Sequence, residues 1–314
     1  MAFRLPVETG VIALLVVISL WLARTFPSFH TGANISDIFS NCSETGIVAA
    51  AMTLVIATGG IDISVGSVVG LCGVILGTLT VNHSWSLYTA IPITILAGAF
   101  CGWINGTLIS RFKLPPIIAT LAMFSAARAG AYVLSGGDSI SGLPDALTNL
   151  GYGSWMGVPI SVWIAGTILV LMGILLKKTR FGRQILSLGG NRVAAQLSGV
   201  NIMRTEASVY VISGMMAGLA SIIVTARGAT AVPDAGQFFE LRAITAVVVG
   251  GTPVIGGRAT MIGTALGLLT MRVVQNGVTL YKKDGMWENL VMAVVLLLAV
   301  EVDRWRRTRE MKAS

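Results

Sequence analysis

The sequence predicts an all-α, polytopic membrane protein, and three observations support this class. Hydrophobic residue types make up 54% of the 314 residues, and charged residues make up only 11%, against about 25% in a soluble domain. The mean hydropathy is +0.80. Long apolar runs recur without the polar–apolar alternation of a membrane β-barrel. Together these features exclude an ordinary soluble globule and a disordered chain.

The apolar runs predict about ten transmembrane helices in one transmembrane domain, 1–314. A spanning helix needs about 20 mainly apolar residues. The predicted spans, of which the second and eighth are shorter than this, are 10–26, 46–58, 65–81, 89–109, 115–134, 159–176, 206–226, 241–255, 259–278 and 287–302. No small-x-small cleavage site follows the first run, so we interpret it as a membrane helix and not as a signal peptide.

The distribution of basic residues predicts the orientation. Ten spans place both termini on one side of the membrane, and 15 of the 22 Lys and Arg residues fall on that side, against five on the other. Arg128 and Arg272 lie inside predicted spans. Cytoplasmic loops carry an excess of Lys and Arg, so we expect both termini to be cytoplasmic. The net charge of +8 then reflects topology and contact with anionic lipid headgroups, and not nucleic-acid binding.

Two Gly-Gly pairs interrupt the apolar pattern, one in each half of the chain. Residues 55–67 read Val-Ile-Ala-Thr-Gly-Gly-Ile-Asp-Ile-Ser-Val-Gly-Ser, and residues 247–258 read Val-Val-Val-Gly-Gly-Thr-Pro-Val-Ile-Gly-Gly-Arg. Interruptions of this kind at corresponding positions indicate a transport site built from broken helices. The alternative is that each pair forms a tight turn between two spans at the membrane interface.

Asp62, in the first interruption, is the most notable acidic residue. A carboxylate within a bilayer is costly unless it has a partner or water. Three roles fit its position: binding a polyhydroxylated solute, binding a cation, or capping the helix that begins at Val65 at the membrane surface. Arg128 and Arg272 either pair with acids or extend to an interface.

The longest predicted cytoplasmic loop, 177–204, contains a predicted short helix at 191–199. Asn191 is a favourable N-cap, and Gly199 suits the position after a helix. One interpretation is a docking element for a partner protein; the other is an amphipathic connector on the membrane surface. The residues that would carry the docking role are Gly189, Gly190, Asn191, Ala194, Ala195, Leu197, Ser198 and Gly199.

Several kinds of catalytic and metal site have no support in the sequence. No Gly-x4-Gly-Lys-Ser/Thr phosphate loop is present, so the chain does not bind ATP through that motif. There is no HExxH and no GxSxG motif. Three cysteines (Cys42, Cys72, Cys101) and two histidines form neither CxxC pairs nor ligand spacing. We therefore expect a protein that is not an enzyme and has no metal or cofactor of its own.

The chain resembles the membrane permease subunits of bacterial monosaccharide ATP-binding cassette (ABC) importers, of the ribose, galactose, xylose, arabinose and rhamnose type. Three segments carry this resemblance: GGIDISVGS (59–67), FGRQILSLGGNRVAAQLSGVNI (181–202) and ELRAITAVVVGGTPVIGG (240–257). Gln275-Asn276-Gly277 fits the same pattern, and the resemblance extends over roughly 5–305. Two residues depart from it: Arg242 stands where the family usually has an acid, and Arg128 is unusual in the fifth span.

The resemblance implies a permease subunit in the bacterial inner membrane that moves a monosaccharide or related small polar solute into the cytoplasm. Its implied partners are an ATP-binding cassette subunit that binds the ATP, a periplasmic or lipoprotein sugar-binding protein, and a second permease subunit, identical or not. The loop matching 181–202 is then expected to be the coupling region that docks on the ATPase. Candidate groups along the solute path are Asp62, Ser64, Asn105, Thr252 and Asn276, with Trp103 or Phe124 as a stacking face.

Other functions remain open at this point. A secondary transporter would use Asp62 as an ion-coupling carboxylate. Within ABC importers, a permease for a nucleoside, an amino acid or a furanone-type signal shares the ten-helix plan. A channel or scaffold would need no binding protein. The small number of charges within the spans favours ATP-driven transport over ion coupling.

Overall fold

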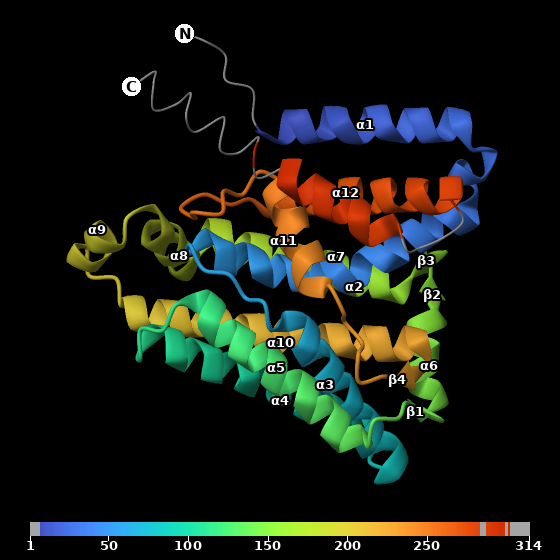
Figure 1. Cartoon of the computed structure of the whole chain (residues 1–314), viewed down its shortest axis with the longest axis horizontal. Coiled ribbons are helices and arrows are strands. Elements are labelled where there is room, and N and C mark those ends of the chain that lie inside the picture. Colours follow the sequence, from blue (N-terminus) through green and yellow to red (C-terminus); the bar gives the residue numbers. More distant parts are fainter. Residues whose placement is uncertain (1–6, 283–286, 299–300, 302–314) are drawn as a thin grey trace.

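The computed structural model describes residues 7–282, 287–298 and 301, and this part of the protein is a bundle of helices with four very short strands (Figure 1). The helices are α1 (Val7–Thr25), α2 (Gly32–Ala57), α3 (Val65–Gly77), α4 (Leu87–Ser110), α5 (Pro116–Ser135), α6 (Asp145–Tyr152), α7 (Ile160–Lys178), α8 (Arg180–Gly190), α9 (Arg192–Leu197), α10 (Ile202–Gly228), α11 (Phe239–Val249) and α12 (Met261–Lys282), followed by a helix at Trp287–Leu298.

The remaining elements are short. A 3-10 turn, η1 (Pro27–His30), follows α1, and a π-helical turn, η2 (Thr78–Asn82), extends α3. Strand β1 (Ile140–Ser141) pairs antiparallel with β4 (Thr230–Ala231), and β2 (Ser154–Trp155) with β3 (Val158–Pro159). These two ladders lie at the end of the bundle opposite α8 and α9 (Figure 1).

Seven of the helices in the described residues are long and apolar enough to cross a membrane: α1, α2, α3 with η2, α4, α5, α7 and α10. The predicted polytopic helical class is confirmed. The predicted number of ten spans is not confirmed. Helix α11 has only 11 residues, the helix at Trp287–Leu298 is also short, and α12 is not among the seven candidate spans.

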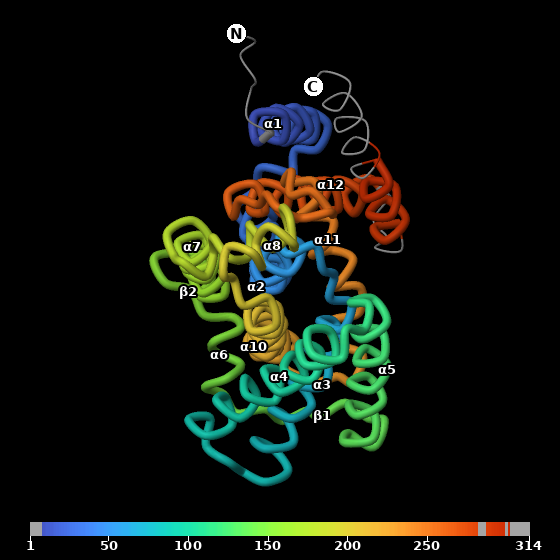
Figure 2. Tube along the Cα trace, turned by 90° about the vertical axis from the view of Figure 1, so that its left-hand side faces the viewer, coloured from blue at the N-terminus to red at the C-terminus, as the bar shows by residue number. Residues whose placement is uncertain are grey.

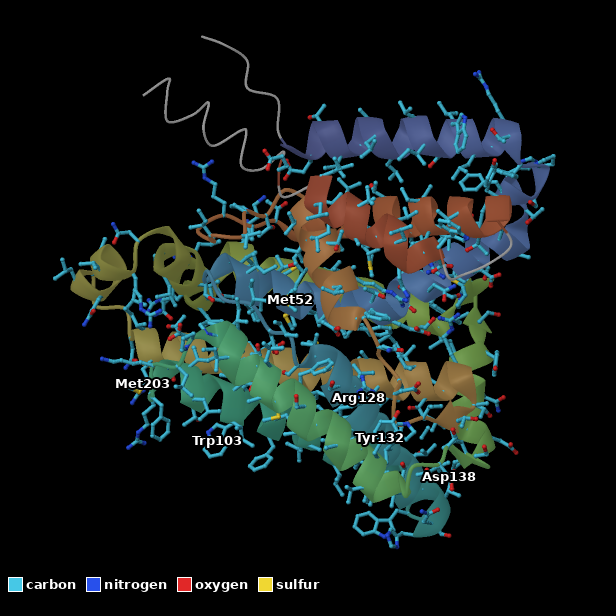
Figure 3. All side chains as sticks on the ribbon, viewed as in Figure 1. Met52, Trp103, Arg128, Tyr132, Asp138 and Met203 are labelled. Atoms are coloured by element: carbon cyan, nitrogen blue, oxygen red, sulfur yellow. The ribbon has the colours of Figure 1, made fainter. Side chains whose placement is uncertain are left out.

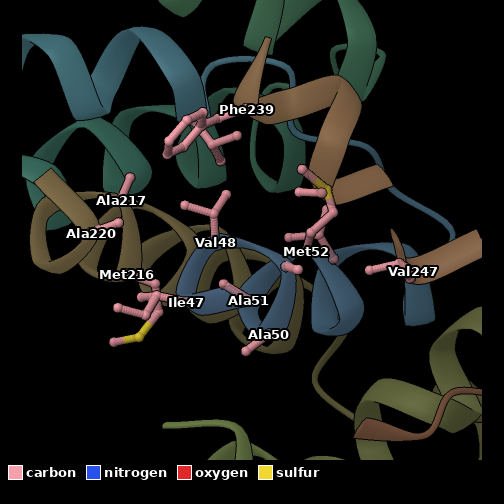
Figure 4. Close-up of a cluster of buried hydrophobic side chains, with 14 of the residues drawn as sticks. Ile47, Val48, Ala50, Ala51, Met52, Met216, Ala217, Ala220, Phe239 and Val247 are labelled. Carbon is pink, nitrogen blue, oxygen red and sulfur yellow. The ribbon is translucent and has the colours of Figure 1, made fainter. Parts of the chain in front are cut away.

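Helices α2 and α10 form the centre of the bundle. In their apolar windows, 83% and 72% of the residues are buried, against 11% in α1, which lies at the periphery (Figures 1 and 2). Figure 4 shows Val48 and Met52 of α2 in the apolar core, with Ala217 of α10 and Phe239 of α11 in the same cluster. The outward faces of α1, α4, α5 and α7 expose large apolar side chains, as expected for helices that face lipid.

Glycines bring α4 and α10 into backbone contact. A Cβ atom on Gly102 would lie 2.2 Å from the carbonyl oxygen of Tyr210, and one on Gly98 would lie 2.3 Å from that of Gly214. Small residues spaced four apart allow this close approach of membrane helices. The contact fixes α10 against α4 and so positions the residues described below.

The second helix begins 14 residues earlier than predicted, at Gly32. The Thr31 side chain caps it by accepting a hydrogen bond from Asn34 N–H. The Asn34 amide also exchanges hydrogen bonds with the Asn276 amide, at 3.2 and 2.7 Å. This partner is 242 residues away in the sequence, so local polarity alone predicted a later start.

The 177–204 loop, which was predicted to be cytoplasmic, forms α8 and α9 at one end of the bundle, and α6 with the strands lies at the other end (Figure 1). The tail with Arg304, Arg306 and Arg307 lies outside the described residues, as does the start of the chain, so the predicted side of the termini stays a prediction.

Candidate solute path and coupling element

The first Gly-Gly pair lies where the chain leaves α2. That helix ends at Ala57 and α3 begins at Val65, with no regular structure over 60–63. Gly59 has a φ of +83°, which disfavours any residue with a Cβ atom. Gly60 faces the Tyr210 hydroxyl, which would lie 2.5 Å from a Cβ atom there. Both glycines are therefore required by the backbone path of this interruption.

Three hydrogen bonds hold Asp62, two from within the interruption and one from α10. Its Oδ1 accepts from the backbone N–H of Ser64 at 3.0 Å and from the Ser64 hydroxyl at 2.6 Å. Its Oδ2 accepts from the Ser213 hydroxyl of α10 at 2.7 Å. The Asn105 amide of α4 donates to Ser64 Oγ at 2.9 Å. We call Asp62, Ser64, Asn105 and Ser213 the Asp62 cluster.

The Asp62 cluster is enclosed by protein, since each of its four residues is only 1% exposed. Asp62 does accept a backbone hydrogen bond just before α3, as a capping residue would, and it does so in the protein interior. Among the described residues no group of three or more His, Cys, Asp or Glu side chains is placed to hold a metal ion. The structure thus links Ser64 and Asn105, two other candidate path residues, to Asp62.

In the described part of the chain, none of the other predicted path residues hydrogen-bonds to this cluster. Thr252 is 2% exposed, and its hydroxyl has no hydrogen-bond partner within the described part of the chain. Asn276 bonds to Asn34. Trp103 is 53% exposed on the outer side of α4 and stacks on Phe100, with ring centroids 5.7 Å apart (Figure 3). Phe124 is half-buried on α5.

The second interruption follows α11 and touches the first. Gly251, Gly256 and Gly257 have φ values of +91°, +89° and +81°. The backbone N–H of Gly257 donates to the carbonyl oxygen of Ala57, at the end of α2, at 3.0 Å. The two Gly-rich segments, about 190 residues apart in the sequence, are therefore joined by a backbone hydrogen bond.

Three half-buried arginines of the bundle have hydrogen-bond or ion-pair partners. Arg128 on α5 donates to the backbone oxygens of Pro233 and Ala235. Arg227 pairs with Glu44. Arg272 donates to Gln275 Oε1 at 3.1 Å and lies 3.8 Å from a Glu288 carboxylate oxygen. The pairing with acids that was one prediction for Arg272 is found here.

Arg242 on α11 lies over an aromatic ring. Its guanidinium lies 5.8 Å from the centre of the Phe239 ring, within the range of a cation–π contact. Its Nε is buried and has no hydrogen-bond partner in the described residues.

The predicted docking helix is α9, one of the two helices in the 177–204 loop. The Asn191 side chain caps it by accepting from Ala194 N–H at 2.9 Å, and Gly199 follows it with a φ of +80°. Val193 is 68% exposed and Leu197 is 84% exposed. A capped helix with projecting apolar side chains thus lies at the end of the bundle. The preceding helix α8 was not predicted.

Helix α9 is tied to α10 by an ion pair. Two nitrogens of the Arg192 guanidinium donate to the two carboxylate oxygens of Glu206, at 3.0 and 2.9 Å. The hydrogen bonds to Glu206 raise the pKa of Arg192 above its ordinary value, so the guanidinium stays charged. Bidentate pairs of this kind fix orientation as well as distance.

A cavity of about 860 Å³ separates α9 from the first interruption. It is bordered by the first interruption, the α4–α5 loop and the facing ends of α9 and α10; its lining includes Thr58, Gly59, Gly60, Ser110, Lys113, Arg192, Gln196, Asn201 and Glu206. The Asp62 cluster begins two residues beyond Gly60. One hollow therefore adjoins both the broken helix and the predicted docking helix.

Similarity to known proteins identifies the family of this chain. A family model described as "Branched-chain amino acid transport system / permease component" matches residues 34–300. The chain belongs to this permease family. The permease is 35% identical over 308 residues to the ribose import permease protein RbsC of Haemophilus influenzae, covering 97% of this chain and 95% of that protein.

Two further relatives are also sugar permeases. The permease is 35% identical to the L-arabinose ABC transporter permease protein AraH of Azospirillum brasilense, covering 96% of this chain and 89% of that protein. It is 37% identical to RbsC of Escherichia coli K12, covering 94% and 93%. No solved structure matches the chain. The predicted resemblance to permeases of monosaccharide ABC importers is confirmed, and the protein is a multi-pass protein of the bacterial inner membrane.

Three residues that were not predicted lie beside the predicted ones in the fold. Ser213, Tyr210 and Glu206 all lie on α10, and they meet Asp62, Gly60 and Arg192 respectively. Their spacing of three and four residues puts them on one face of α10. A polar stripe in an otherwise apolar span was the available signal.

Proposed function

We propose that the permease is the transmembrane subunit of an ATP-driven importer that moves a monosaccharide into the cytoplasm. The relatives named above are ribose and arabinose permeases, and the similarity covers nearly the whole of each chain. The observation that carries the ATP-driven part is the exposed, capped helix α9, which faces the first interruption across a cavity. ATP is then bound by a separate cassette subunit, and this chain contributes no cofactor site.

In this proposal the solute crosses the membrane between two permease subunits, delivered by an external binding protein. About ten helices cross the membrane, with both termini cytoplasmic, and the two Gly-rich interruptions are broken membrane helices next to the path. ATP binding moves the cassettes, and α9 passes that motion to the bundle. Asp62 then acts by holding the first interruption in shape, because all three of its hydrogen bonds are to protein groups.

The docking role is tested with Leu197→Glu. This side chain is 84% exposed, so the substitution leaves the bundle intact while placing a charge on the docking surface. We expect the cassette subunit to be lost on co-purification and ATP-dependent uptake to fall by about tenfold or more. Met156→Glu, between β2 and β3 at the other end of the bundle and 80% exposed, is the matched control for cassette binding and should retain it. Full cassette binding by Leu197→Glu would exclude α9 as the docking helix.

The driving force and substrate class are tested together in proteoliposomes that contain the permease and its cassette, with ATP inside and the binding protein outside. Labelled D-ribose, L-arabinose, D-fructose and L-leucine are supplied separately. We expect ATP-dependent uptake of one of the sugars that persists with a protonophore. Uptake abolished by the protonophore would favour a secondary transporter, and uptake of L-leucine alone would move the permease to amino acids.

A further inference from the structure

Three segments that are distant in the sequence meet at the end of α8. They are the end of α2 at Ala57, the second interruption at Gly256–Gly257, and Gly189–Gly190, which close α8 just before the docking helix (Figure 1). We call this meeting point the glycine junction. No side chain separates the three backbones there.

The contacts at Gly189 are backbone to backbone. A Cβ atom on Gly189 would lie 2.0 Å from the carbonyl oxygen of Ala57 and 2.5 Å from the backbone nitrogen of Gly257. These two atoms are the ones joined by the 3.0 Å hydrogen bond that links the interruptions. Gly189 therefore packs directly against the bond that holds the first interruption to the second.

The neighbouring glycine is placed differently. A Cβ atom on Gly190 would meet only Gly257 Cα, at an ordinary contact distance of 3.9 Å. The requirement for glycine at this point of the junction thus belongs to Gly189 and not to the Gly-Gly pair as a whole.

Backbone packed against backbone has no rotamers that can absorb a displacement, so closely packed segments transmit small shifts as rigid units. Helix α9 follows α8 after a single residue, Asn191. A displacement of α9 therefore reaches the junction through α8.

We propose that Gly189 is a positioning residue through which movement of the cassette-docking segment α8–α9 shifts both interruptions together. This inference rests on the proposed function, since it assigns the route by which ATP-driven motion reaches the solute path. The ion pair between Arg192 and Glu206 is a second connection, but it leads only to α10.

The test compares Gly189→Ala with Ser187→Ala, an exposed position of the same helix outside the docking residues, in the complete importer in proteoliposomes. For Gly189→Ala we expect cassette binding and ATP hydrolysis to be kept, while the solute transported per ATP falls by about tenfold or more. Ser187→Ala should keep the ratio of the unsubstituted importer. An unchanged transport ratio in Gly189→Ala overturns the proposal. An unsubstituted importer without ATP-dependent uptake contradicts the proposed function instead.

A second measurement does not depend on how well Gly189→Ala folds. Spin labels are placed on Ser187→Cys in α8 and Ile255→Cys in the second interruption, both exposed positions, since the native cysteines are buried. If the junction moves as a unit, the label separation stays constant when ATP is trapped with vanadate, while the separation from Ser187→Cys to Met156→Cys changes. A change between Ser187→Cys and Ile255→Cys would mean that α8 slides past the interruption, and the proposal would be wrong.

Discussion

The two interruptions of the bundle achieve a similar break in helical structure by different chemistry. In the first, the Asp62 carboxyl accepts three hydrogen bonds from Ser64 and Ser213. In the second, three glycines adopt positive φ, and the buried Thr252 hydroxyl has no partner among the described residues. The first is thus held by side chains, and the second by backbone conformation and by contact with its neighbours. Substitution of the polar side chains in the first interruption should therefore act through lost hydrogen bonds, and substitution of the glycines in the second should act through backbone strain and steric conflict.

The largest effect is expected from Asp62→Ala. It leaves the Ser64 N–H and hydroxyl and the Ser213 hydroxyl without their acceptor, and each buried unsatisfied group costs about 1–3 kcal/mol. We expect a loss of roughly 3 kcal/mol or more, seen as a lower apparent melting temperature of the purified permease and reduced uptake. Asp62→Asn, which keeps one acceptor oxygen, should lose less. Equal melting temperatures for Asp62→Ala and the unsubstituted protein would contradict the anchoring role of the carboxyl.

Gly256→Ala tests the second interruption. A Cβ atom there would lie 2.6 Å from Gly59 N and 2.8 Å from the Ala57 carbonyl oxygen, at a φ of +89°. We expect destabilisation of about 2–3 kcal/mol from backbone strain together with the clash. Gly199→Ala, at a φ of +80° with nothing within 4 Å, is the control for strain alone and should cost about 1 kcal/mol. Thermal unfolding of both variants separates the two effects, and equal losses would remove the role of the contact.

Ser213→Ala is expected to have an intermediate effect on the first interruption. It removes the 2.7 Å hydrogen bond to Asp62 Oδ2, and we expect a loss of about 1–2 kcal/mol. The control is Ser221→Ala on the same helix, where the buried hydroxyl donates only to the Gly218 carbonyl of its own helix. Its loss should be smaller in the same melting experiment. If both variants lose the same stability, the bond to Asp62 contributes nothing beyond an ordinary serine contact.

The smallest effect is expected from Thr252→Val in the second interruption. The hydroxyl it removes has no hydrogen-bond partner in the described part of the chain, and the two side chains are similar in volume. We expect a change in stability within about 0.5 kcal/mol. The measurement also tests the predicted solute contact: unchanged stability with a raised KM for uptake would support it, and unchanged kinetics would remove Thr252 from the path.

Parts of the fold and of the site followed directly from local sequence. The capped helix after Asn191 was predicted and is present as α9, because capping depends on residues within one turn. Asp62, Ser64 and Asn105 were predicted as separate groups along the solute path, and the structure links them by hydrogen bonds. Trp103 was assigned to the same path, yet it lies on the outer side of α4. Residue type indicated polarity and aromatic character but not which face of a helix would be enclosed.

The sequence by itself determined the membrane class, the positions of most helices, the two Gly-rich interruptions and the family. Each depends on composition, on apolar length or on a short contiguous motif. Only the tertiary structure decided that Ser213 completes the bonds of Asp62, and that Ala57, Gly189 and Gly257 meet in one junction. Such contacts join residues more than 60 positions apart. They depend on how closely α10 packs on α4 and α8 on α2, which no local pattern specifies.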